Sequence, residues 1–316
     1  MRTLSRREFL KLCAVSTAGV SLGSLLGWDF VFNTFARAAE GRPTVVWLQG
    51  SACSGCSVSL LNSVDPPVAD LILKLTGLKY HPLLMAAAGE MGVDLLEEVA
   101  RKERGNFVLV VEGGIPTAER GRYCLIGEQH GQAVTMLDAV RILGNAALVT
   151  VAAGQCASFG GIPGAAPNPT GVVGVDRVLA DRPVINLGLC PMHPDHFLGT
   201  VVHLLNYGLP ELDELKRPKM FYPGPIHENC PRRPDFEAGR FASSIGEEGC
   251  LARLGCKGFI ARADCGNQGW NHGVNWCIKA GAPCMACSEP YFPDHTGPFY
   301  GLFTVSRTRS EARPSS

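Results

Sequence analysis

From His227 to Cys287 the chain holds seven cysteines, with His227 at ligand spacing from the first of them, and few residues that could build a hydrophobic core. The eight side chains are His227, Cys230, Cys250, Cys256, Cys265, Cys277, Cys284 and Cys287. Glycine, proline, asparagine and isolated apolar residues separate them, without a helical or alternating pattern. We expect such a segment to fold around metal, because ligation then supplies the free energy that burial cannot. Eight soft ligands make two complete sets of four.

Upstream of this segment, short apolar runs predict the strands of a parallel sheet. The runs cover residues 45–48, 107–111, 147–151 and 183–187, with a weaker candidate, second in order, at 78–81. Continuous runs rich in Val and Leu are typical of strands that are buried on both faces of a sheet. Helical patterns lie at residues 57–62, 93–102, 134–143 and 196–207. The alternation predicts a doubly wound α/β domain.

Four cysteines follow the predicted strands, close to the point where each strand ends. They are Cys53 and Cys56 after the first strand, Cys156 after the fourth and Cys190 after the fifth. Ligands of open α/β sheets bind at this carboxyl edge. A single buried cysteine is usually a small apolar residue, and a lone Cys-x-x-Cys is equally a redox dithiol. Four cysteines at equivalent strand ends, with glycine close by, favour one shared metal site. Cys124 has no partner at ligand spacing, and packing is the favoured interpretation for it.

The N-terminus has the pattern of a targeting signal. Arg6 and Arg7 precede a mildly apolar run at residues 12–27, and a small-residue cleavage site lies at 36–38. This pattern resembles a twin-arginine export signal, which we expect to occupy residues 1–38 and to be removed. An uncleaved membrane helix is the weaker alternative, because the run contains serines and a threonine. The mature chain is therefore expected in the bacterial periplasm.

Cysteine number does not by itself distinguish metal sites from disulfides. The chain has 13 cysteines, and 12 remain once Cys13 leaves with the signal. An even number in an exported protein usually indicates disulfides. However, a chain of this length needs no cross-links to hold a core, and twin-arginine substrates are exported already folded. We therefore favour thiols that bind metal before export.

The types of the ligand residues do not distinguish zinc from iron–sulfur clusters. Tetrahedral zinc accepts four thiolates, or three thiolates and one imidazole. The tandem ferredoxin spacing that would indicate iron–sulfur clusters is absent. A structural zinc protein and an iron–sulfur electron carrier are thus both consistent with the ligands.

The order of the sequence motifs is more specific, and it resembles the small subunits of nickel–iron hydrogenases. The motifs are WLQGSACSGCSVSLLN at 47–62, VEGGIPT at 111–117, GQCASFGG at 154–161, PNPTG at 167–171, IHENC at 226–230, GCKG at 255–258 and Cys284-x2-Cys287. The resemblance covers nearly the whole mature chain. It implies a flavodoxin-like domain at residues 39–207 and an irregular iron–sulfur-binding domain at 208–316.

The resemblance also implies ligands for three clusters, matched motif by motif. The proximal [4Fe–4S] cluster takes Cys53, Cys56, Cys156 and Cys190; the distal [4Fe–4S] cluster takes His227, Cys230, Cys250 and Cys256; the medial cluster takes Cys265, Cys284 and Cys287. Many relatives have proline where this chain has Cys277, and they hold a three-iron medial cluster. Cys277 supplies a fourth thiolate, as in the nickel–iron–selenium branch, and implies a medial [4Fe–4S] cluster. A [3Fe–4S] cluster is the alternative if Cys277 is not a ligand.

The implied function is electron transfer in a periplasmic hydrogenase. Nickel in a separate large subunit would cleave hydrogen, and the clusters would pass electrons to an acceptor, a multihaem cytochrome c. The other partner implied is the twin-arginine translocase. We expect no membrane anchor, since the chain ends in a polar tail at 314–316, and no nucleic acid, since Lys+Arg and Asp+Glu both number 29. The alternative is a related electron-transfer subunit outside hydrogenases, because the α/β half also resembles a small subunit of respiratory complex I.

Glu112 is expected near the proximal cluster or at the interface with the large subunit, or else as a helix cap or surface carboxylate.

Overall fold

The computed structural model describes residues 43–63, 67–71 and 76–297. The predicted signal at 1–38 and the polar tail at 314–316 lie outside these residues. Within them, no helix combines the length and the apolar character that crossing a membrane requires.

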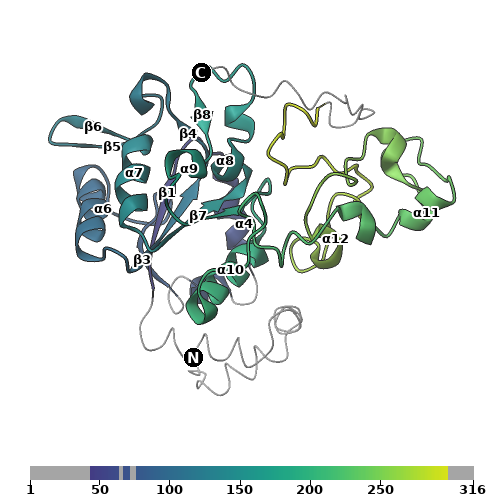
Figure 1. The fold of residues 1–316 in the computed structure, drawn as a ribbon, viewed down its shortest axis with the longest axis horizontal. Helices are drawn as coiled ribbons and strands as arrows, with labels where there is room; N and C mark the ends of the chain where they lie inside the picture. The colour runs from purple at the N-terminus through teal and green to yellow at the C-terminus, as the bar shows by residue number, and fades with distance from the viewer. Residues whose placement is uncertain (1–42, 64–66, 72–75, 298–316) are drawn as a thin grey trace.

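Five parallel strands form the central sheet (Figure 1). They are β1 (Thr44–Gln49), β2 (Gly77–Tyr80), β3 (Phe107–Glu112), β7 (Val149–Ala153) and β9 (Val184–Leu187). Their order is β2-β1-β3-β7-β9, with β1 paired to β2 on one side and to β3 on the other. The chain therefore winds first to one side of β1 and then to the other, which is the flavodoxin-like arrangement. The α/β prediction is confirmed, and all five strands lie within two residues of their predicted positions.

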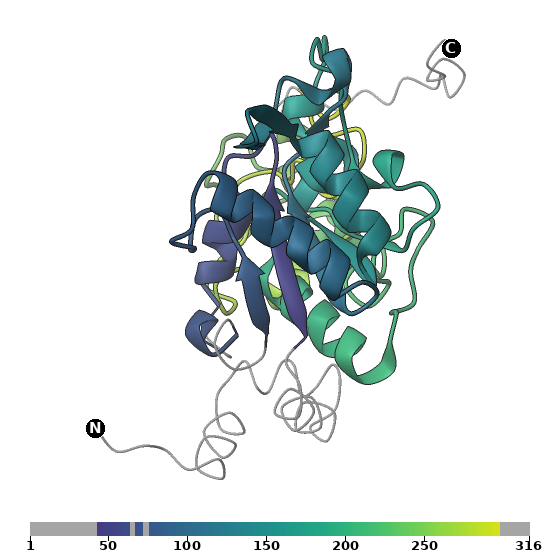
Figure 2. The ribbon, with the colours of Figure 1, turned by 90° about the vertical axis from the view of Figure 1, so that its left-hand side faces the viewer.

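Helices cover both faces of the sheet and bury its alternating side chains. One layer holds α6 (Glu90–Lys102), α7 (Met136–Ala146), α8 (Gly154–Phe159) and α9 (Val175–Val178); the other holds α4 (Gly55–Leu61), α5 (Val68–Asp70) and α10 (Pro194–Tyr207). Along β1, Val46 and Leu48 enter the core under α6 and α7, while Val45 and Trp47 enter the core under α4 and α10. In Figure 2 the first layer, blue to teal, lies in front of the strands.

Two small antiparallel pairs were not predicted. The strands β5 (Leu125–Gln129) and β6 (Gln132–Thr135) form a hairpin, and β4 (Ile115–Pro116) pairs with β8 (Val172–Val173). The hairpin is largely exposed and its register is interrupted by a bulge, so its sequence carries no continuous apolar run. The helix expected at 134–143 begins only after the hairpin, because the Thr135 hydroxyl accepts from the Asp138 amide at 3.1 Å and caps α7.

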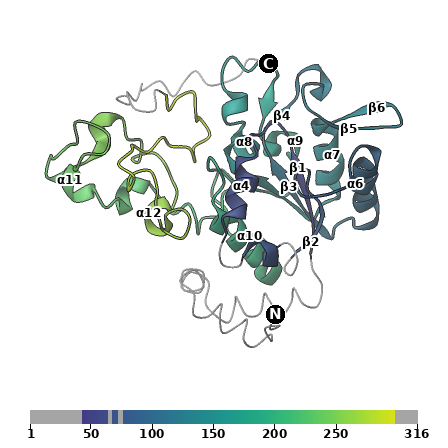
Figure 3. The ribbon, with the colours of Figure 1, turned by 180° about the vertical axis from the view of Figure 1, so that it is seen from behind.

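Beyond α10 the described chain forms turns and short helices without extended strands (Figure 3). The elements are the 3-10 turns η4 (Ile226–Asn229) and η5 (Leu251–Leu254) and the helices α11 (Arg233–Glu237) and α12 (Cys265–Gln268). Their core contains Phe221, Tyr222 and Trp276 together with cysteines, and it also takes in Leu189 from the loop after β9. The irregular character predicted for this part is confirmed. Its boundary as a separate domain near residue 207 stays a prediction.

A buried network of polar contacts lies within this part and reaches the α/β part through Gln155. The Arg217 guanidinium donates from Nε to Asp213 Oδ2 at 2.8 Å and from Nη1 to Glu289 Oε1 at 3.2 Å. Gln155, next to Cys156, donates to the Glu289 carbonyl at 2.6 Å. The Arg217 pairs hold Asp213 and Glu289 together inside the C-terminal part, because losing either partner would leave an unpaired charge in the interior.

Candidate metal centres

The first group of thiols lies at the carboxyl edge of the sheet. Cys53 and Cys56 lie at the start of α4, Cys156 in α8 after β7, and Cys190 in the loop after β9. Gly154 lies so close to this group that a Cβ at its position would meet Cys56 Sγ at 2.3 Å, and its φ of +86° favours glycine as well. The backbone therefore approaches the sulfur as only glycine allows.

Burial and neighbouring charges raise the pKa values of these thiols. The pKa of the Cys156 thiol is raised to about 12, first by burial and then by the sulfurs of Cys190 and Cys53. The pKa of Cys56 is also raised well above its ordinary value. Burial is the largest cause, and the charges of Glu112, Cys156 and Cys190 act in the same direction. Four thiolates so placed repel one another unless cations neutralise them, and metal-bound thiols are deprotonated. The donor set therefore fits a metal cluster.

Glu112 is buried beside this group, with 2% of its surface exposed. The carboxylate accepts from the amides of Cys56 at 3.0 Å and Ser57 at 3.2 Å, the free first-turn donors of α4. It also accepts from the Ser57 hydroxyl, from Trp47 Nε1 at 3.0 Å and from Gln49 Nε2 at 2.8 Å. Glu112 is thus not a surface carboxylate: it caps α4 from a neighbouring strand and holds the turn that carries Cys56.

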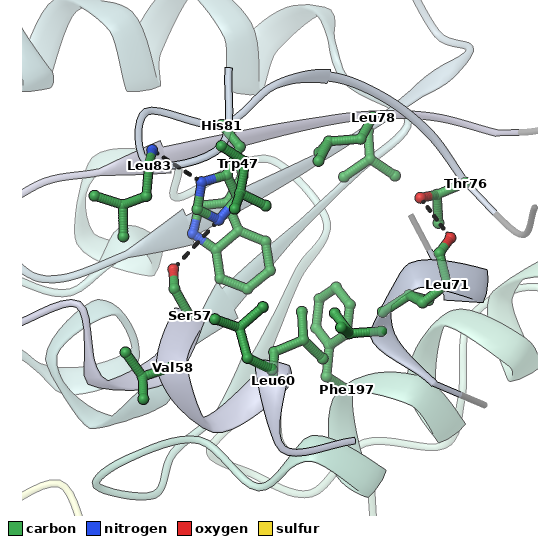
Figure 4. A pocket seen from close by; sticks show the side chains of 14 residues that line it. Trp47, Ser57, Val58, Leu60, Leu71, Thr76, Leu78, His81, Leu83 and Phe197 are labelled. Carbon is green, nitrogen blue, oxygen red and sulfur yellow. Dashed lines mark hydrogen bonds between the residues drawn. The ribbon is translucent and has the colours of Figure 1, made fainter. Parts of the chain in front are cut away.

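The contacts continue from Ser57 to His81, beside an apolar cavity of about 60 Å³ (Figure 4). The Leu83 amide donates to His81 Nδ1 at 3.2 Å, so the Nε2 proton points to the Ser57 oxygen at 3.3 Å. The His81 ring stacks on Trp47 with centroids 5.2 Å apart, and burial lowers the pKa of His81. The neutral imidazole therefore links the loop after β2 to the capped end of α4.

A second group of thiols lines one cavity of about 300 Å³ in the C-terminal part. The four sulfur-bearing residues predicted for the medial site are all in its wall: Cys265, Cys277, Cys284 and Cys287. Burial raises the pKa of Cys287 to about 12 and those of Cys265 and Cys284 well above the ordinary value. Trp270 and Trp276 close the cavity with apolar surface. A cavity walled by thiols and apolar groups fits a compact, sulfur-bound, water-excluding group.

The third group lies near the surface, around η4 and η5. Burial raises the pKa of Cys230, and the sulfurs of Cys256 and Cys250 raise it too. His227 lies within η4, just before Cys230, and its amide donates to the Gly258 carbonyl at 2.9 Å. Its ring lies against Phe259 at 4.1 Å and Phe236 at 4.8 Å between centroids. Burial, and after it the charge of Arg233, lowers the pKa of His227, which favours the neutral, metal-binding imidazole.

The three groups follow one another through the molecule. Cys190 of the first group also lines the medial cavity, and its sulfur is close enough to raise the pKa of Cys287. The Cys284 amide of the second group donates to Cys256 Sγ of the third at 3.4 Å. The second group thus adjoins both the first and the third.

Cys124 lies outside these groups. It packs against the core under α6 and α7, as expected for a structural cysteine. Burial raises the pKa of Cys124, and a hydrogen bond with the Ser51 hydroxyl opposes this shift.

Among the described residues no three His, Cys, Asp or Glu side chains are arranged to hold a single metal ion. In an iron–sulfur cluster each protein ligand binds a different iron atom, so its ligands lie farther apart than those of one ion.

Sequence reasoning missed several buried groups beside these sites. His193 and His196 stack with centroids 4.8 Å apart, and His196 Nε2 lies 2.7 Å from Asp264 Oδ1, next to Cys265. Lys257, between the second and third groups, is also buried. Burial lowers the pKa of Lys257, whereas the Cys256 and Cys284 sulfurs raise it. No pattern signals these positions, because each depends on contacts between distant segments.

Comparison with protein families gives two matches that together span most of the described chain. The model for the C-terminal part of the NiFe/NiFeSe hydrogenase small subunits matches residues 222–300. The model described as NADH ubiquinone oxidoreductase, 20 Kd subunit, matches residues 53–204. The likeness of the α/β half to respiratory complex I is therefore real, but the C-terminal part matches a hydrogenase model.

Individual relatives agree. The chain is 44% identical over 314 residues to the periplasmic [NiFeSe] hydrogenase small subunit of Desulfomicrobium baculatum, covering 94% of this chain and 99% of that one. It is 38% identical to the periplasmic [NiFe] hydrogenase small subunit of Solidesulfovibrio fructosivorans, covering 94% and 93%.

Solved structures of complete hydrogenases show the same fold. The reduced, active Ni-Fe-Se hydrogenase from Desulfomicrobium baculatum matches with a TM-score of 0.79 and 45% identity over 82% of this chain and 99% of that chain. The oxidised [NiFeSe] hydrogenase from Desulfovibrio vulgaris Hildenborough matches with a TM-score of 0.79 and 42% identity over 84% and 99%. The chain therefore belongs to the NiFe/NiFeSe hydrogenase small subunits, iron–sulfur electron-transfer proteins that pair with a large subunit in which the catalytic site lies.

Proposed function

We propose that the twelve residues gathered in the three groups hold three [4Fe–4S] clusters. Cys53, Cys56, Cys156 and Cys190 would bind the proximal cluster, Cys265, Cys277, Cys284 and Cys287 the medial one, and His227, Cys230, Cys250 and Cys256 the distal one. The observation that carries the proposal is the cavity of about 300 Å³ lined by the four medial thiols, by Cys190 and by two tryptophans. Bound clusters would supply one-electron transfer, and the chain would hold them in a row and exclude water from the middle one.

The arrangement supports a direction for the relay. The proximal group lies at the open carboxyl edge of the sheet, where Cys53 is exposed and available to the large subunit. At the other end, Phe236 and Phe259 beside His227 are 37% and 39% exposed. Electrons would therefore pass between the partner's nickel site and a surface marked by His227. We expect a multihaem cytochrome c in the periplasm to accept electrons at this exposed end, because one of its haems needs only to come close to the distal cluster.

The proposed setting follows from the relatives and from the N-terminal pattern. The relatives from Desulfomicrobium baculatum and Solidesulfovibrio fructosivorans are named periplasmic. The paired arginines at residues 6 and 7 support export through the twin-arginine translocase, with cleavage at about residue 38. The mature protein would then consist of the flavodoxin-like domain at 39–207 and the cluster domain at 208–316.

Iron and sulfide quantification with EPR tests the cluster assignment. We expect about twelve iron atoms for each small subunit and no strong three-iron signal in the oxidised complex, because Cys277 completes the medial set. The Cys277→Pro variant should lose about one iron and gain that signal. Zinc without sulfide would disprove the clusters altogether, whereas a stoichiometric three-iron signal in the unmodified protein would remove Cys277 alone from the ligands.

The His227→Ala variant tests the exit end. The complex should retain hydrogen isotope exchange, which needs only the large subunit, while reduction of an external acceptor slows by about tenfold or more. His130→Ala, at an exposed turn between β5 and β6, is the matched control and should change neither rate. Equal loss of exchange and acceptor reduction in His227→Ala would contradict an exit role.

A further inference from the structure

Lys257 lies between the proposed medial and distal ligands, with 1% of its surface exposed. It follows Cys256 of the distal group, and its amide donates to the carbonyl of Cys284 of the medial group at 2.9 Å. Its ammonium donates to the Gly255 carbonyl at 2.8 Å. The backbone on both sides is thus tied to the two groups, and the charged end is held in the interior beside them.

A buried ammonium is rare because its desolvation must be offset by negative charge. Burial lowers the pKa of Lys257, whereas the nearby Cys256 and Cys284 sulfurs raise it. Once these sulfurs bind iron they are thiolates, and a [4Fe–4S] core bound by four thiolates is net anionic. The medial set holds four thiolates and the distal set three with one imidazole, so the medial cluster carries the greater negative charge. A positive charge between them is placed to offset it.

We propose that Lys257 is a positioning residue for the relay, a fixed positive charge that the medial and distal clusters share and that raises the reduction potentials of both. The inference rests on the proposed ligand sets and adds a residue that binds no iron. Its physical basis is Coulombic, since an added electron is stabilised by a cation nearby and the effect is strong where water is excluded. Among the described thiols, those whose charges act on the pKa of Lys257 are Cys256 and Cys284, of the distal and medial groups, so we expect the proximal potential to be unaffected.

The test is an EPR-monitored redox titration of the complete heterodimer carrying Lys257→Met. The medial and distal potentials should both fall, the proximal potential should stay unchanged, and Lys257→Arg should restore the unmodified values. Lys279→Met is the matched control: Lys279 also donates to a glycine carbonyl, that of Gly273 at 3.0 Å, and lies two residues from Cys277, but it is exposed. Water screens its charge, so its removal should leave all three potentials in place.

A structural role is separated from the charge by Lys257→Gln, which keeps a donor for Gly255 but is neutral. Loss of iron from the Met and Gln variants but not from the Arg variant would overturn the proposal, because the charge would then serve cluster assembly and not the potentials. Full iron content with unchanged medial and distal potentials in the Met or Gln variant would overturn it. Loss of iron from the Arg variant as well would show that only lysine fits and would also overturn it. Failure of the ligand assignment is distinct, because it would show as missing iron in the unmodified protein.

Discussion

Replacing Gly154 by alanine is expected to remove the proximal cluster and leave the other two. A Cβ at this position would lie 2.3 Å from Cys56 Sγ and 3.3 Å from the Leu189 carbonyl oxygen. In a chain without iron the Cys56 side chain can rotate away, so the protein should still fold. A sulfur bound to iron cannot rotate away, and the cluster would lose its ligand. We therefore expect about four fewer iron atoms for each small subunit, and loss of electron transfer from hydrogen to any acceptor.

The matched control is Gly105→Ala. Gly105 also has a positive φ, of +78°, but a Cβ there meets nothing within 4 Å. Both variants suffer the same kind of backbone strain, of about 1 kcal/mol, and only Gly154→Ala adds the clash with sulfur. Iron quantification and the EPR signals of the medial and distal clusters are the measurements. Full iron content in Gly154→Ala, or equal loss of iron in both variants, would show that the close approach of Gly154 to Cys56 does not matter.

The sheet was predictable because burial on both faces leaves a simple pattern. The apolar runs at β1, β3, β7 and β9 are long enough to be recognised as buried strands. Because ligands bind beyond the carboxyl ends of parallel strands, the four cysteines that follow these strands are expected at one edge of the sheet. The pair β4–β8 has only two residues in each strand, and the β5–β6 hairpin is exposed, so neither has a pattern to detect.

The surroundings of the sites were not predictable, because they depend on tertiary contacts. The Glu112 carboxylate accepts hydrogen bonds from the amides of Cys56 and Ser57, which lie more than 50 residues away in sequence. Nothing near Glu112 in the sequence indicates that it caps α4. Likewise, Lys257 resembles any surface lysine until the chain folds over it. Ligands can be recognised by residue type and spacing, whereas the groups that orient them are ordinary residues made special by burial.

The largest effect is expected from withdrawing iron, which should unfold the C-terminal part and spare the sheet. The hydrophobic core of that part includes Cys265 and Cys284 themselves, and its cavity measures about 300 Å³. Without the cluster these thiols and the apolar wall around them face water instead of a bound group. A whole domain is stable by only about 5 to 15 kcal/mol. The cluster therefore accounts for much of what holds this part together.

Hydrogen exchange on the full chain, prepared with and without iron, measures this dependence. Without iron, amides in 208–297 should lose protection, while those of β1, β3 and β7 keep it, because their two cores consist of aliphatic and aromatic side chains on either face of the sheet. The sheet is the internal control within the same molecule. Equal protection of both parts without iron would mean that packing alone holds the C-terminal part. A colourless, compact protein with its thiols joined in disulfides would also contradict the prediction, since cross-links would then have taken the place that we assign to the clusters.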